Sequence, residues 1–377
     1  MRTIDGRRCR FLMGRVLLGV ALLFVTATAL AQSQITTGAI EGTVTDPSGA
    51  AIAGATVVIK HVATGVERTL TTDSAGRFVA PLLPVGDYQI TVSASGFGTL
   101  VSRGYSLALG RTVVANISLQ LGTVAQTVTV EATSPLVETA RTDQSTMVSP
   151  QAALALPLNG RRFLDLAFLT PLVTQELERG QLSVAGQRGI NSVLNVDGVD
   201  FTEPFFGGQR GGERSNSAYI VSQEAVREFQ VVRSGFAPEF GRSTGGVVNV
   251  ITKSGSNDFH GSAFYYARHR EFAPKTVFGD NVASTRQQFG GALGGRIRKD
   301  KTFFYTVYDQ QKDVTPLTIR FNNTTGLPAS LLARQGVFTS TNSVFTYLVK
   351  IDHQVTRNTR VSGSRSEERR VGKECRL

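Results

Sequence analysis

Few side chains in this sequence could carry out catalysis or hold a metal ion. The chain has four histidines and two cysteines: His61, His260, His269, His353, Cys9 and Cys375. None of the histidines stands in an HExxH or HxxE spacing that could bind zinc. Both cysteines lie close to the chain ends, so the interior has neither a disulfide nor a thiolate metal site. We therefore expect no enzyme, in particular no zinc hydrolase, and no cofactor.

One glycine-rich segment, residues 201–216, could contact a ligand. A phosphate-binding loop would need Lys-Ser or Lys-Thr after its last glycine, but Gly212 is followed by Glu213. A calcium site is a second interpretation, built from three nearby carboxylates: Asp197, Asp200 and Glu203. Hard cations prefer such clustered oxygens, although hairpin aspartates are also common for turn reasons alone. A flexible surface loop without a ligand is the third interpretation.

The formal net charge of +11 suggests nucleic-acid binding at first sight. Much of the excess charge lies in the first 31 and the last 13 residues, and the segment between them has no basic run. Phosphate binding needs a basic patch rather than scattered charges. We therefore expect no nucleic-acid partner.

The first 31 residues indicate export. An arginine-rich start precedes an apolar run from Val16 to Leu30, and Ala29 and Ala31 provide the small residues of a cleavage site before Gln32. This pattern is typical of a secretory signal peptide. The alternative, a membrane anchor, would need about 20 apolar residues, and the run is shorter and interrupted by threonines.

Residues 38–121 predict an immunoglobulin-like or transthyretin-like β-sandwich. Short alternating or apolar strands recur between turn sequences such as Asp46 to Gly49 and Asp73 to Gly76. The segment resembles the carboxypeptidase regulatory-like domain in the order of ten residues: Gly42, Val44, Asp46, Gly49, Gly76, Phe78, Gly86, Tyr88, Gly96 and Phe97. Peptidase activity is not implied, because the metal ligands of a catalytic domain are absent. A spacer role is favoured over sugar binding, since no site is visible.

The stretch Arg227–Tyr266 is the segment from which the rest of the chain is interpreted. We predict a strand at Phe229–Arg233, a turn with a short helical piece at Gly235–Arg242, a strand at Gly246–Thr252 and an aromatic strand at Phe259–Arg268. This order resembles the end of the plug domain and the first barrel strand of TonB-dependent outer-membrane receptors. Because the match extends over about forty residues, it is more specific than a lone glycine motif.

The resemblance continues upstream, where residues 134–253 match a plug of α+β type. The sequence from Leu156 to Arg161, LPLNGR, is similar to that of the Oar-like branch of these receptors. We predict short helices at Gln151–Leu156 and Arg162–Leu169, and a tight hairpin centred on Asp197-Gly198. In this family the outer loops of the plug touch ligand. The resemblance therefore implies a ligand-sensing loop with six candidate residues: Phe205, Phe206, Gln209, Arg210, Glu213 and Arg214.

A short segment within the linker at residues 122–133 resembles the TonB box. Its residues are Thr127, Val128, Thr129, Val130 and Glu131. In the family, such an extended segment pairs with the inner-membrane energy coupler by strand addition. The alternative is that this segment is the exit strand of the sandwich.

Residues 254–364 predict the first strands of an antiparallel transmembrane β-barrel. They hold half of the Phe and Tyr residues in less than a third of the chain, as aromatic girdles require. Strands are expected near 259–268, 286–297, 302–311 and 343–352, with long, short and long connections, the short one facing the periplasm. One face of each strand, such as Phe289 to Ile297 in alternation, would meet lipid. A soluble β protein is the alternative, although its loops need not alternate in length.

The alternation of the strands stops at about Ser364, and residues 365–377 are dense in charge. We expect this tail to be foreign to the gene, with a native soluble tail as the alternative. Family receptors close 22 strands, so the resemblance implies an amino-terminal fragment.

The sequence as a whole predicts a mainly β chain of the TonB-dependent receptor type in the outer membrane. The implied function is energised uptake of a solute, such as a glycan, peptide or metal chelate, driven by a TonB-type coupler. The competing hypothesis is a surface binding or adhesion protein that uses the sandwich and transports nothing. A regulatory partner of a secreted peptidase would require zinc ligands that the chain lacks.

Overall fold

The computed structural model describes residues 36–122, 128–131, 143–148, 161, 163–176, 180–203, 205, 207–208, 221–236, 238, 240–274, 284–319, 321, 325–357 and 359–373. The expected cleavage site, the helix predicted at 151–156 and most of the ligand-sensing loop lie outside these residues. The described chain is mainly β, which confirms the predicted class. Among its helices, none is long and apolar enough to cross a bilayer.

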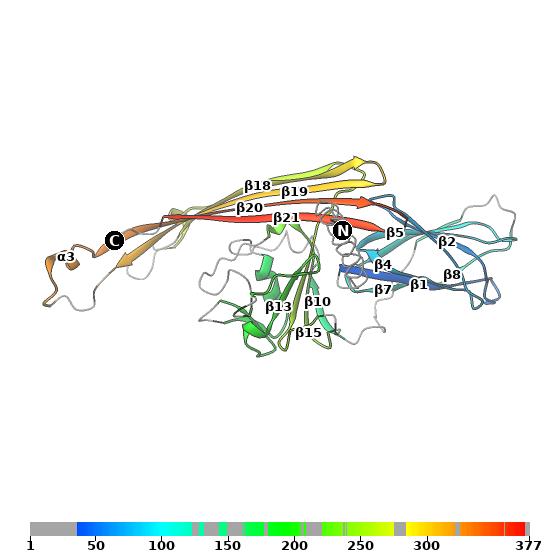
Figure 1. Ribbon diagram of the computed structural model, residues 1–377, viewed down its shortest axis with the longest axis horizontal. Coiled ribbons are helices and arrows are strands. Elements are labelled where there is room, and N and C mark those ends of the chain that lie inside the picture. Colours follow the sequence, from blue (N-terminus) through cyan, green and yellow to red (C-terminus); the bar gives the residue numbers. More distant parts are fainter. Residues whose placement is uncertain are drawn as a thin grey trace, which may run out of the picture.

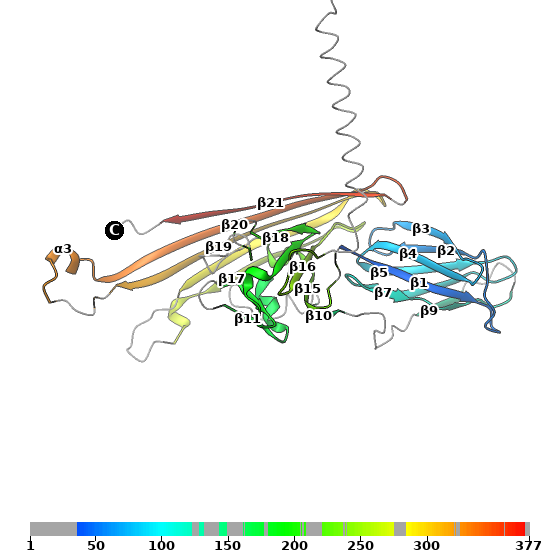
Figure 2. The same cartoon turned by 60° about the horizontal axis from the view of Figure 1, so that its bottom comes forward.

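Three bodies make up the described chain (Figure 1). A long C-terminal sheet runs along the molecule, a middle segment lies against one of its faces, and a sandwich sits at one end of it (Figures 1 and 2). That end of the sheet carries the turn at residues 299–301. The opposite end carries the short helix α3, Ala329–Leu332.

The sandwich consists of two sheets that pack over one apolar core. One sheet has the order β4-β1-β7 with β8 also paired to β1, and the other has the order β3-β2-β5-β6-β9. The strand bounds are β1 Thr37–Thr45, β2 Thr56–His61, β3 Glu67–Thr71, β4 Arg77–Pro84, β5 Gly86–Ser93, β6 Leu100–Leu107, β7 Thr112–Val114, β8 Ile117–Ser118 and β9 Val128–Glu131. Alternate residues of β1, β2 and β5 are buried, as expected for strands with one face on a core.

Two aspartates shape turns of the sandwich. The carboxylate of Asp46 accepts hydrogen bonds from the backbone N–H groups of Ser48 and Ala50, each at 2.9 Å. Asp73 accepts in the same way from the N–H groups of Ala75 and Arg77. Side-chain oxygens that bind backbone N–H groups a few residues on favour turns over continued strand. These turns lie where the sequence predicted them.

The middle segment is built on a sheet with the order β10-β15-β16-β13-β14. Its elements are β10 Gln144–Val148, η2 Phe163–Leu169, β11 Val173–Gln175, β12 Leu182–Val184, η3 Gly189–Asn191, β13 Val193–Val196, β14 Val199–Asp200, η4 Gln223–Ala225, β15 Val226–Ser234 and β16 Val247–Thr252. All residues of β16 are buried, because it lies between β15 and β13 and both faces of the sheet are covered there. Val248 and Val250 join the core of the middle segment, and Ile251 packs against Val85 and Leu109 of the sandwich. The strands predicted here at 229–233 and 246–252 are confirmed.

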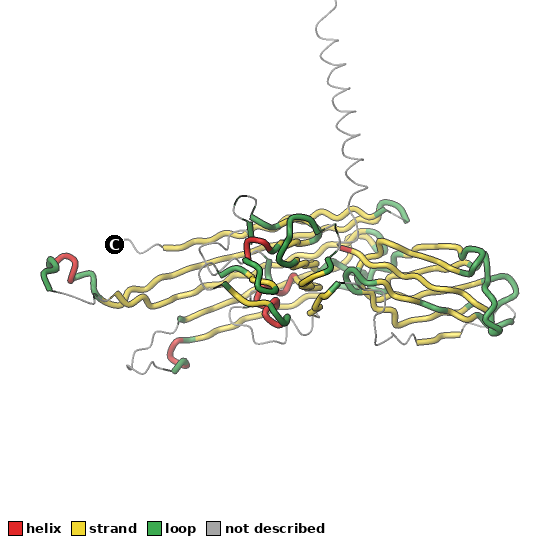
Figure 3. The backbone as a smooth tube through the Cα atoms, turned by 90° about the horizontal axis from the view of Figure 1, so that it is seen from below, coloured by secondary structure: helices red, strands yellow, loops and turns green. Residues whose placement is uncertain are grey.

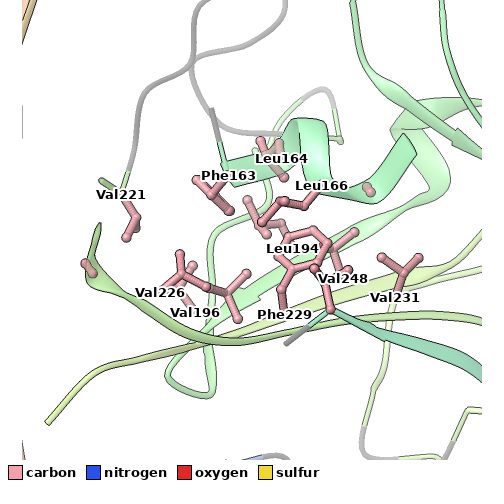
Figure 4. Close-up of a cluster of buried hydrophobic side chains, with 14 of the residues drawn as sticks. Phe163, Leu164, Leu166, Leu194, Val196, Val221, Val226, Phe229, Val231 and Val248 are labelled. Carbon is pink, nitrogen blue, oxygen red and sulfur yellow. The ribbon is translucent and has the colours of Figure 1, made fainter. Parts of the chain in front are cut away.

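The short buried helix expected after Arg161 is the 3-10 helix η2. Figure 4 shows Phe163, Leu164 and Leu166 above the sheet, next to Phe229. The rings of Phe163 and Phe229 meet edge to face, with centroids 6.3 Å apart. This contact closes the apolar core of the middle segment.

Two predictions for the middle segment have different outcomes. The hairpin at Asp197-Gly198 is confirmed, since both residues have positive φ, +49° and +79°, as a two-residue turn with the twist of the strands requires. The short helical piece expected within Gly235–Arg242 is wrong for the described residues, which form turns and bends. Gly235 and Arg242 also adopt positive φ, and this conformation interrupts a helix.

The C-terminal sheet is a continuous antiparallel meander with the order β17-β18-β19-β20-β21 (Figure 3). Its elements are β17 His260–Arg268, η5 Arg270–Phe272, β18 Thr285–Arg298, β19 Thr302–Ile319, β20 Gly336–Gln354 and β21 Arg360–Lys373. The four predicted strands are confirmed, but β19 and β20 run further than the alternation of apolar residues suggested. Their ladder continues from Thr315↔Ser340 to Ile319↔Gly336, beyond Val314, the last residue of β19 paired with β18.

The predicted end of strand structure at Ser364 is wrong. Strand β21 pairs with β20 from Gln354↔Arg360 to Thr341↔Lys373, so the charged residues continue the sheet. Backbone groups make the ladder, and the long edge of β20 offers partners whatever the side chains of β21 are. The hydroxyl of Tyr347 on β20 donates to Glu367 on β21 at 2.7 Å, a cross-strand contact that a charged strand can make.

Candidate functional site

The candidate site is the interface between the middle segment and the C-terminal sheet. The inner face of the sheet buries polar side chains almost fully, namely Gln288, Asp309, Thr346, Lys350 and Asp352. The outer face exposes apolar side chains, among them Phe289, Leu293, Ile297, Val349 and Ile351. The predicted division of the two faces is therefore confirmed. Leu348 departs from the alternation because it packs into the apolar core of the middle segment.

Lys350 on β20 ties the sheet to the Asp197 hairpin. Its Nζ lies 3.3 Å from Asp197 Oδ1 and 3.0 Å from Thr252 Oγ1. Thr252 also donates to the same carboxylate, through its backbone N–H at 2.9 Å and its hydroxyl at 2.5 Å. The carboxylate thus has three donors from two different bodies, and such charge-assisted hydrogen bonds are stronger than neutral ones.

The calcium interpretation finds no support in this arrangement. Asp197 is bound by Lys350 and Thr252, and Asp200 pairs with Arg242 at 3.2 Å. Within the part of the chain that the structure describes, no group of three or more His, Cys, Asp or Glu side chains could hold a metal ion.

Glu224 is the centre of a second polar cluster. It lies in η4, where the Ser222 hydroxyl caps the helix by accepting from the N–H of Glu224. Its carboxylate lies 3.2 Å from Arg161 and 3.9 Å from Lys253, and it accepts a hydrogen bond from Ser262 of β17 at 3.3 Å. Burial lowers the pKa of Lys253, and the charge of Glu224 opposes this shift.

Arg161 reaches the sheet through aromatic rings. Its guanidinium lies 4.2 Å from the ring centroid of Tyr266 and 5.7 Å from that of Phe264, both on β17. A cation over an aromatic face at these distances is attracted by the ring quadrupole. Arg161 has φ +48°, an uncommon conformation for a residue with a side chain.

A third contact lies at the N-terminus of η4, at its cap residue Ser222. The Ser222 hydroxyl donates to Asp309 Oδ2 on β19 at 2.7 Å, and Gln288 Nε2 on β18 donates to both oxygens of that carboxylate at 3.1 Å. The hydroxyl of Tyr305 donates to the backbone oxygen of Glu224 at 3.0 Å. Strands β17 and β19 of the sheet thus both provide hydrogen-bond partners for η4 and its cap residue.

This interface joins the two bodies through polar pairs and through Tyr305, Val307 and Leu348, which pack into the apolar core of the middle segment. Its charged groups are paired while it is closed, and they return to water when it opens. The cost of desolvating charges roughly offsets their attraction when a buried pair forms. The arrangement has no nucleophile, base and electrophile set for covalent chemistry among the residues described above.

The TonB-box-like residues lie on the sandwich in this structure. Val128–Glu131 form β9, which runs parallel to β6 in the register Leu100↔Val128 to Arg103↔Glu131. Thr127 lies outside the described residues. This placement is the one expected of an exit strand, and it is also an extended edge segment of the kind that strand addition uses.

The ligand-sensing loop is described only in part. Phe205 is exposed over 85% of its surface. Gly207 and Gly208 both have positive φ, and the backbone N–H of Gly207 donates to the oxygen of Glu203 at 3.0 Å. Phe206, Gln209, Arg210, Glu213 and Arg214 lie outside the described residues, as do Ala29 and Ala31 at the expected cleavage site.

Sequence reasoning did not single out the residues that form the interface. Glu224, Asp309 and Lys350 are ordinary charged residues in the sequence, separated by long stretches of chain. One signal could have found two of them, because Asp309 and Lys350 are charged residues within strands that alternate toward an inner face.

Two family models match the chain. The carboxypeptidase regulatory-like domain matches residues 39–120, and the outer membrane beta barrel domain matches residues 251–370. The second match extends past Ser364, in agreement with the strand found there.

Two curated relatives are TonB-dependent proteins. The chain is 30% identical over 345 residues to the TonB-dependent transporter Oar of Myxococcus xanthus, covering 85% of this chain and 30% of that protein. It is 26% identical over 161 residues to the probable TonB-dependent siderophore receptor PirA of Acinetobacter baumannii, covering 42% of this chain and 20% of that protein. The crystal structure of PirA aligns with a TM-score of 0.45 at 20% identity, over 60% of this chain and 32% of that one. The chain thus spans less than a third of the length of these relatives.

Proposed function

Because the chain is recognised as a relative of Oar-like TonB-dependent outer-membrane receptors with a carboxypeptidase regulatory-like domain, we propose that it serves energised uptake of a solute across the outer membrane. In this proposal residues 38–121 are the accessory sandwich, 122–133 a linker, 134–253 the plug and 254–364 the first strands of the barrel wall. Residues 1–31 direct export.

The observation that carries the proposal is the inverted polarity of the C-terminal sheet. A sheet in water buries its apolar face and exposes its polar one. Here the apolar face is exposed, while Lys350, Asp309 and Gln288 are buried against the middle segment. A wall with lipid outside and a polar interior has this arrangement. The buried polar contacts then hold the plug in place without preventing its release.

The proposed partners follow from the same division. The outer face of the sheet meets outer-membrane lipid, and a TonB-type coupler of the inner membrane pairs with residues 127–131 by strand addition. The loop around Phe205 faces the solute, which we place among glycans, peptides and metal chelates. The names of the relatives include a siderophore receptor, which makes iron chelates the first class to test.

The test is growth and uptake by a strain deleted for the gene and complemented with variants. Candidate glycans, peptides and ferric chelates are supplied as the sole source of carbon, nitrogen or iron. Wild-type complementation is expected to restore uptake of one of them. Val128→Pro and Val130→Pro are expected to abolish it, because proline removes the N–H that a strand partner needs. Val128→Ile is the matched control and should retain uptake.

Two results would contradict the proposal. One is uptake that persists in both proline variants and after the proton gradient is collapsed. The other is a chain that fractionates with soluble periplasmic proteins rather than with the outer membrane. The amount of each variant in the outer membrane must be measured, so that loss of uptake is not confused with loss of protein.

A further inference from the structure

The end of the sandwich nearest the C-terminal sheet touches two bodies at once. Three of its connections meet there, namely the β2–β3 turn, the β4–β5 turn and the segment after β6. The middle segment lies against two of these connections, and the turn between β18 and β19 lies against the third. The sandwich therefore bridges the two bodies that form the polar interface.

Toward the middle segment the contact is mainly apolar. Val85 and Leu109 of the sandwich form a separate buried cluster with Ile251 of β16, and Met147 of β10 packs against it. The backbone N–H of Leu109 donates to Glu228 Oε2 at 2.7 Å. Leu109 is fully buried, so this contact excludes water.

Toward the C-terminal sheet the contact is polar and close. The N–H of Asn257, just before β17, donates to the backbone oxygen of Ala63 at 2.9 Å. The side chain of Asn257 donates to Asp300 Oδ1 at 2.7 Å and accepts from the N–H of Asp300 at 2.9 Å. Gly65 packs so closely on the Asp300 carboxylate that a Cβ would have no room. The β2–β3 turn is thus seated on the β18–β19 turn.

Residues of the middle segment and of the C-terminal sheet both lie around the β4–β5 turn. At Gly86 the space that a Cβ would occupy is filled by the ring of His61 and the guanidinium of Arg227 from β15. Arg360, the first residue of β21, pairs with Asp352 at 2.8 Å and contacts Ser254 at 3.4 Å. Its charge also acts on His61.

From these contacts we propose that the sandwich is an autoinhibitory latch, which holds the middle segment to the C-terminal sheet while it is seated and must leave before the two separate. The inference rests on the proposed function for its biological meaning, but its mechanical part does not. A body bound to both sides of an interface resists their relative motion, because one of its two contacts must break first.

The position of β9 gives the latch a release mechanism. β9 is paired with β6, so force applied to Val128–Glu131 reaches the sandwich before it reaches the middle segment. A partner that takes β9 by strand addition also removes the edge strand of the sandwich sheet. The latch would then be released by the same event that delivers the energy.

A reversible crosslink tests the latch in the outer membrane. Ala63→Cys and Asn257→Cys place two thiols at residues joined by a backbone hydrogen bond, in a chain with Cys375→Ser. We expect a disulfide on mild oxidation, seen as a shift in gel mobility and as loss of thiol alkylation. Ser48→Cys with Asn257→Cys is the control, because Ser48 lies in a turn at the far end of the sandwich, and it should not crosslink. Failure of the first pair to crosslink would overturn the seating itself.

The crosslinked protein then tests whether the sandwich must leave before the middle segment separates from the C-terminal sheet. In mild urea, protease should cut the middle segment at least about tenfold more slowly in the oxidised form than in the same protein after reduction, because the latch can no longer open. Equal cleavage rates would overturn the latch, whatever uptake shows. In cells, oxidation should stop energised uptake, and reduction should restore it.

These two measurements separate the latch from the proposed function. Slow cleavage with no uptake of any solute by the wild-type protein would contradict uptake and leave the latch standing. Normal uptake by the oxidised protein would contradict the latch and leave uptake standing. A variant without new cysteines adds an independent test. Asp300→Ala should speed cleavage several-fold, whereas Lys299→Ala, an exposed neighbour in the same turn, should not.

Discussion

The sandwich core and the interface of the middle segment with the C-terminal sheet are both buried, but their chemistry differs. The sandwich core consists of aliphatic and aromatic side chains such as Ile40, Ile59 and Ile90, none exposed by more than 1%. The interface contains Lys350, Asp309 and other polar groups that find their partners across it. One kind of burial suits a body that stays closed, and the other suits two bodies that part.

The two surfaces differ in how much free energy hydration returns when each is exposed to water. Apolar area returned to water costs roughly 25 cal/mol per Å², with nothing to offset it. A buried ion pair returned to water recovers the hydration that both partners lost, so the polar part of the interface opens at little cost. The cost of opening then comes from the apolar side chains of the sheet that join the core of the middle segment, Tyr305, Val307 and Leu348. Removing one partner is a different matter, because the remaining charge stays buried without compensation. Substitutions at chosen residues of the interface and of the sandwich core test this contrast.

The largest effect is expected at Lys350. Lys350→Ala leaves the Asp197 carboxylate without its cation, and breaking a buried pair in this way costs about 3 to 5 kcal/mol. The free energy of unfolding should be measured by urea titration in detergent. The double variant Lys350→Met with Asp197→Asn removes both charges and should recover most of the loss. If the double variant were as unstable as the sum of the single variants, the two residues would not act as a pair.

In the sandwich core, Ile90→Ala should cost about 2 to 5 kcal/mol, because it leaves a cavity among rigid neighbours. Ile90 is fully buried. The loss should appear as a lower urea midpoint of the sandwich. Protease cleavage within residues 38–121 at each urea concentration measures this midpoint. Val79→Ala, on an exposed position of β4, is the matched control and should change stability by less than about 0.5 kcal/mol. No charge-removing second substitution should rescue Ile90→Ala, in contrast to Lys350→Ala.

His61 should make the seated sandwich sensitive to acid. Burial, assisted by the positive charges of Arg227 and Arg360, lowers the pKa of His61 to about 4. The unfolded chain binds this proton near pH 6.5, so stability is complete above that value and is lost as the pH falls toward 4. The full loss is up to about 3 kcal/mol. The neutral ring also accepts a hydrogen bond from the N–H of Thr64 at 3.2 Å, which protonation would remove.

The measurement for His61 is the urea midpoint at several pH values between 7 and 4. Asp87 and Tyr88 face His61, and burial raises the pKa of the nearby Glu228. A carboxyl with a raised pKa acts in the opposite direction, because the folded state then takes up its proton earlier as the pH falls. The His61→Gln variant isolates the histidine, and its profile should be flatter than that of the wild type. Parallel profiles would contradict the prediction.

The smallest effect is expected at the exposed pair of Arg242 and Asp200. Its atoms are 3.2 Å apart, but the Arg242 side chain is 64% exposed. Surface pairs contribute about 0 to 1 kcal/mol and are screened by salt. Arg242→Ala should therefore shift the urea midpoint only slightly, and not at all in high salt. A large shift would mean that exposure does not separate weak pairs from strong ones in this protein.

Local patterns in the sequence were sufficient to predict which side chains point inward where one face of a strand packs against a core. The alternation in β18 and β20 predicted which side chains point inward, and the Asp197-Gly198 dipeptide predicted a hairpin that needs two positive φ angles. These features depend on residues that are close in sequence. The strand at Arg360–Lys373 could not be predicted in this way, since its pairing depends on the backbone edge of β20 rather than on its own side chains.

The contacts of the candidate site depend on distant residues. Arg161 and Glu224 are 63 positions apart, and Lys350 and Asp197 are 153 apart. No local period encodes such pairs, and each residue alone is typical of a solvated surface. The partner of Lys350 emerges only when β20 is placed against the middle segment, and the partner of Arg161 only when η4 is placed beside it. The exit-strand and TonB-box interpretations of Val128–Glu131 also have the same local sequence, so only the placement on β6 distinguishes where the segment rests.

The ladder of β19 and β20 that runs past Val314 gives the molecule an uneven rim. From Thr315↔Ser340 to Ile319↔Gly336 the two strands continue as a ribbon that pairs with no third strand among the described residues, roughly 15 Å long at the usual rise per residue. Pro316 fits there, because a ribbon with open sides tolerates a residue that has no N–H to give. In the proposed orientation, with the β18–β19 turn toward the periplasm, this ribbon would extend beyond the ends of β18 and β21 on the outer side of the membrane.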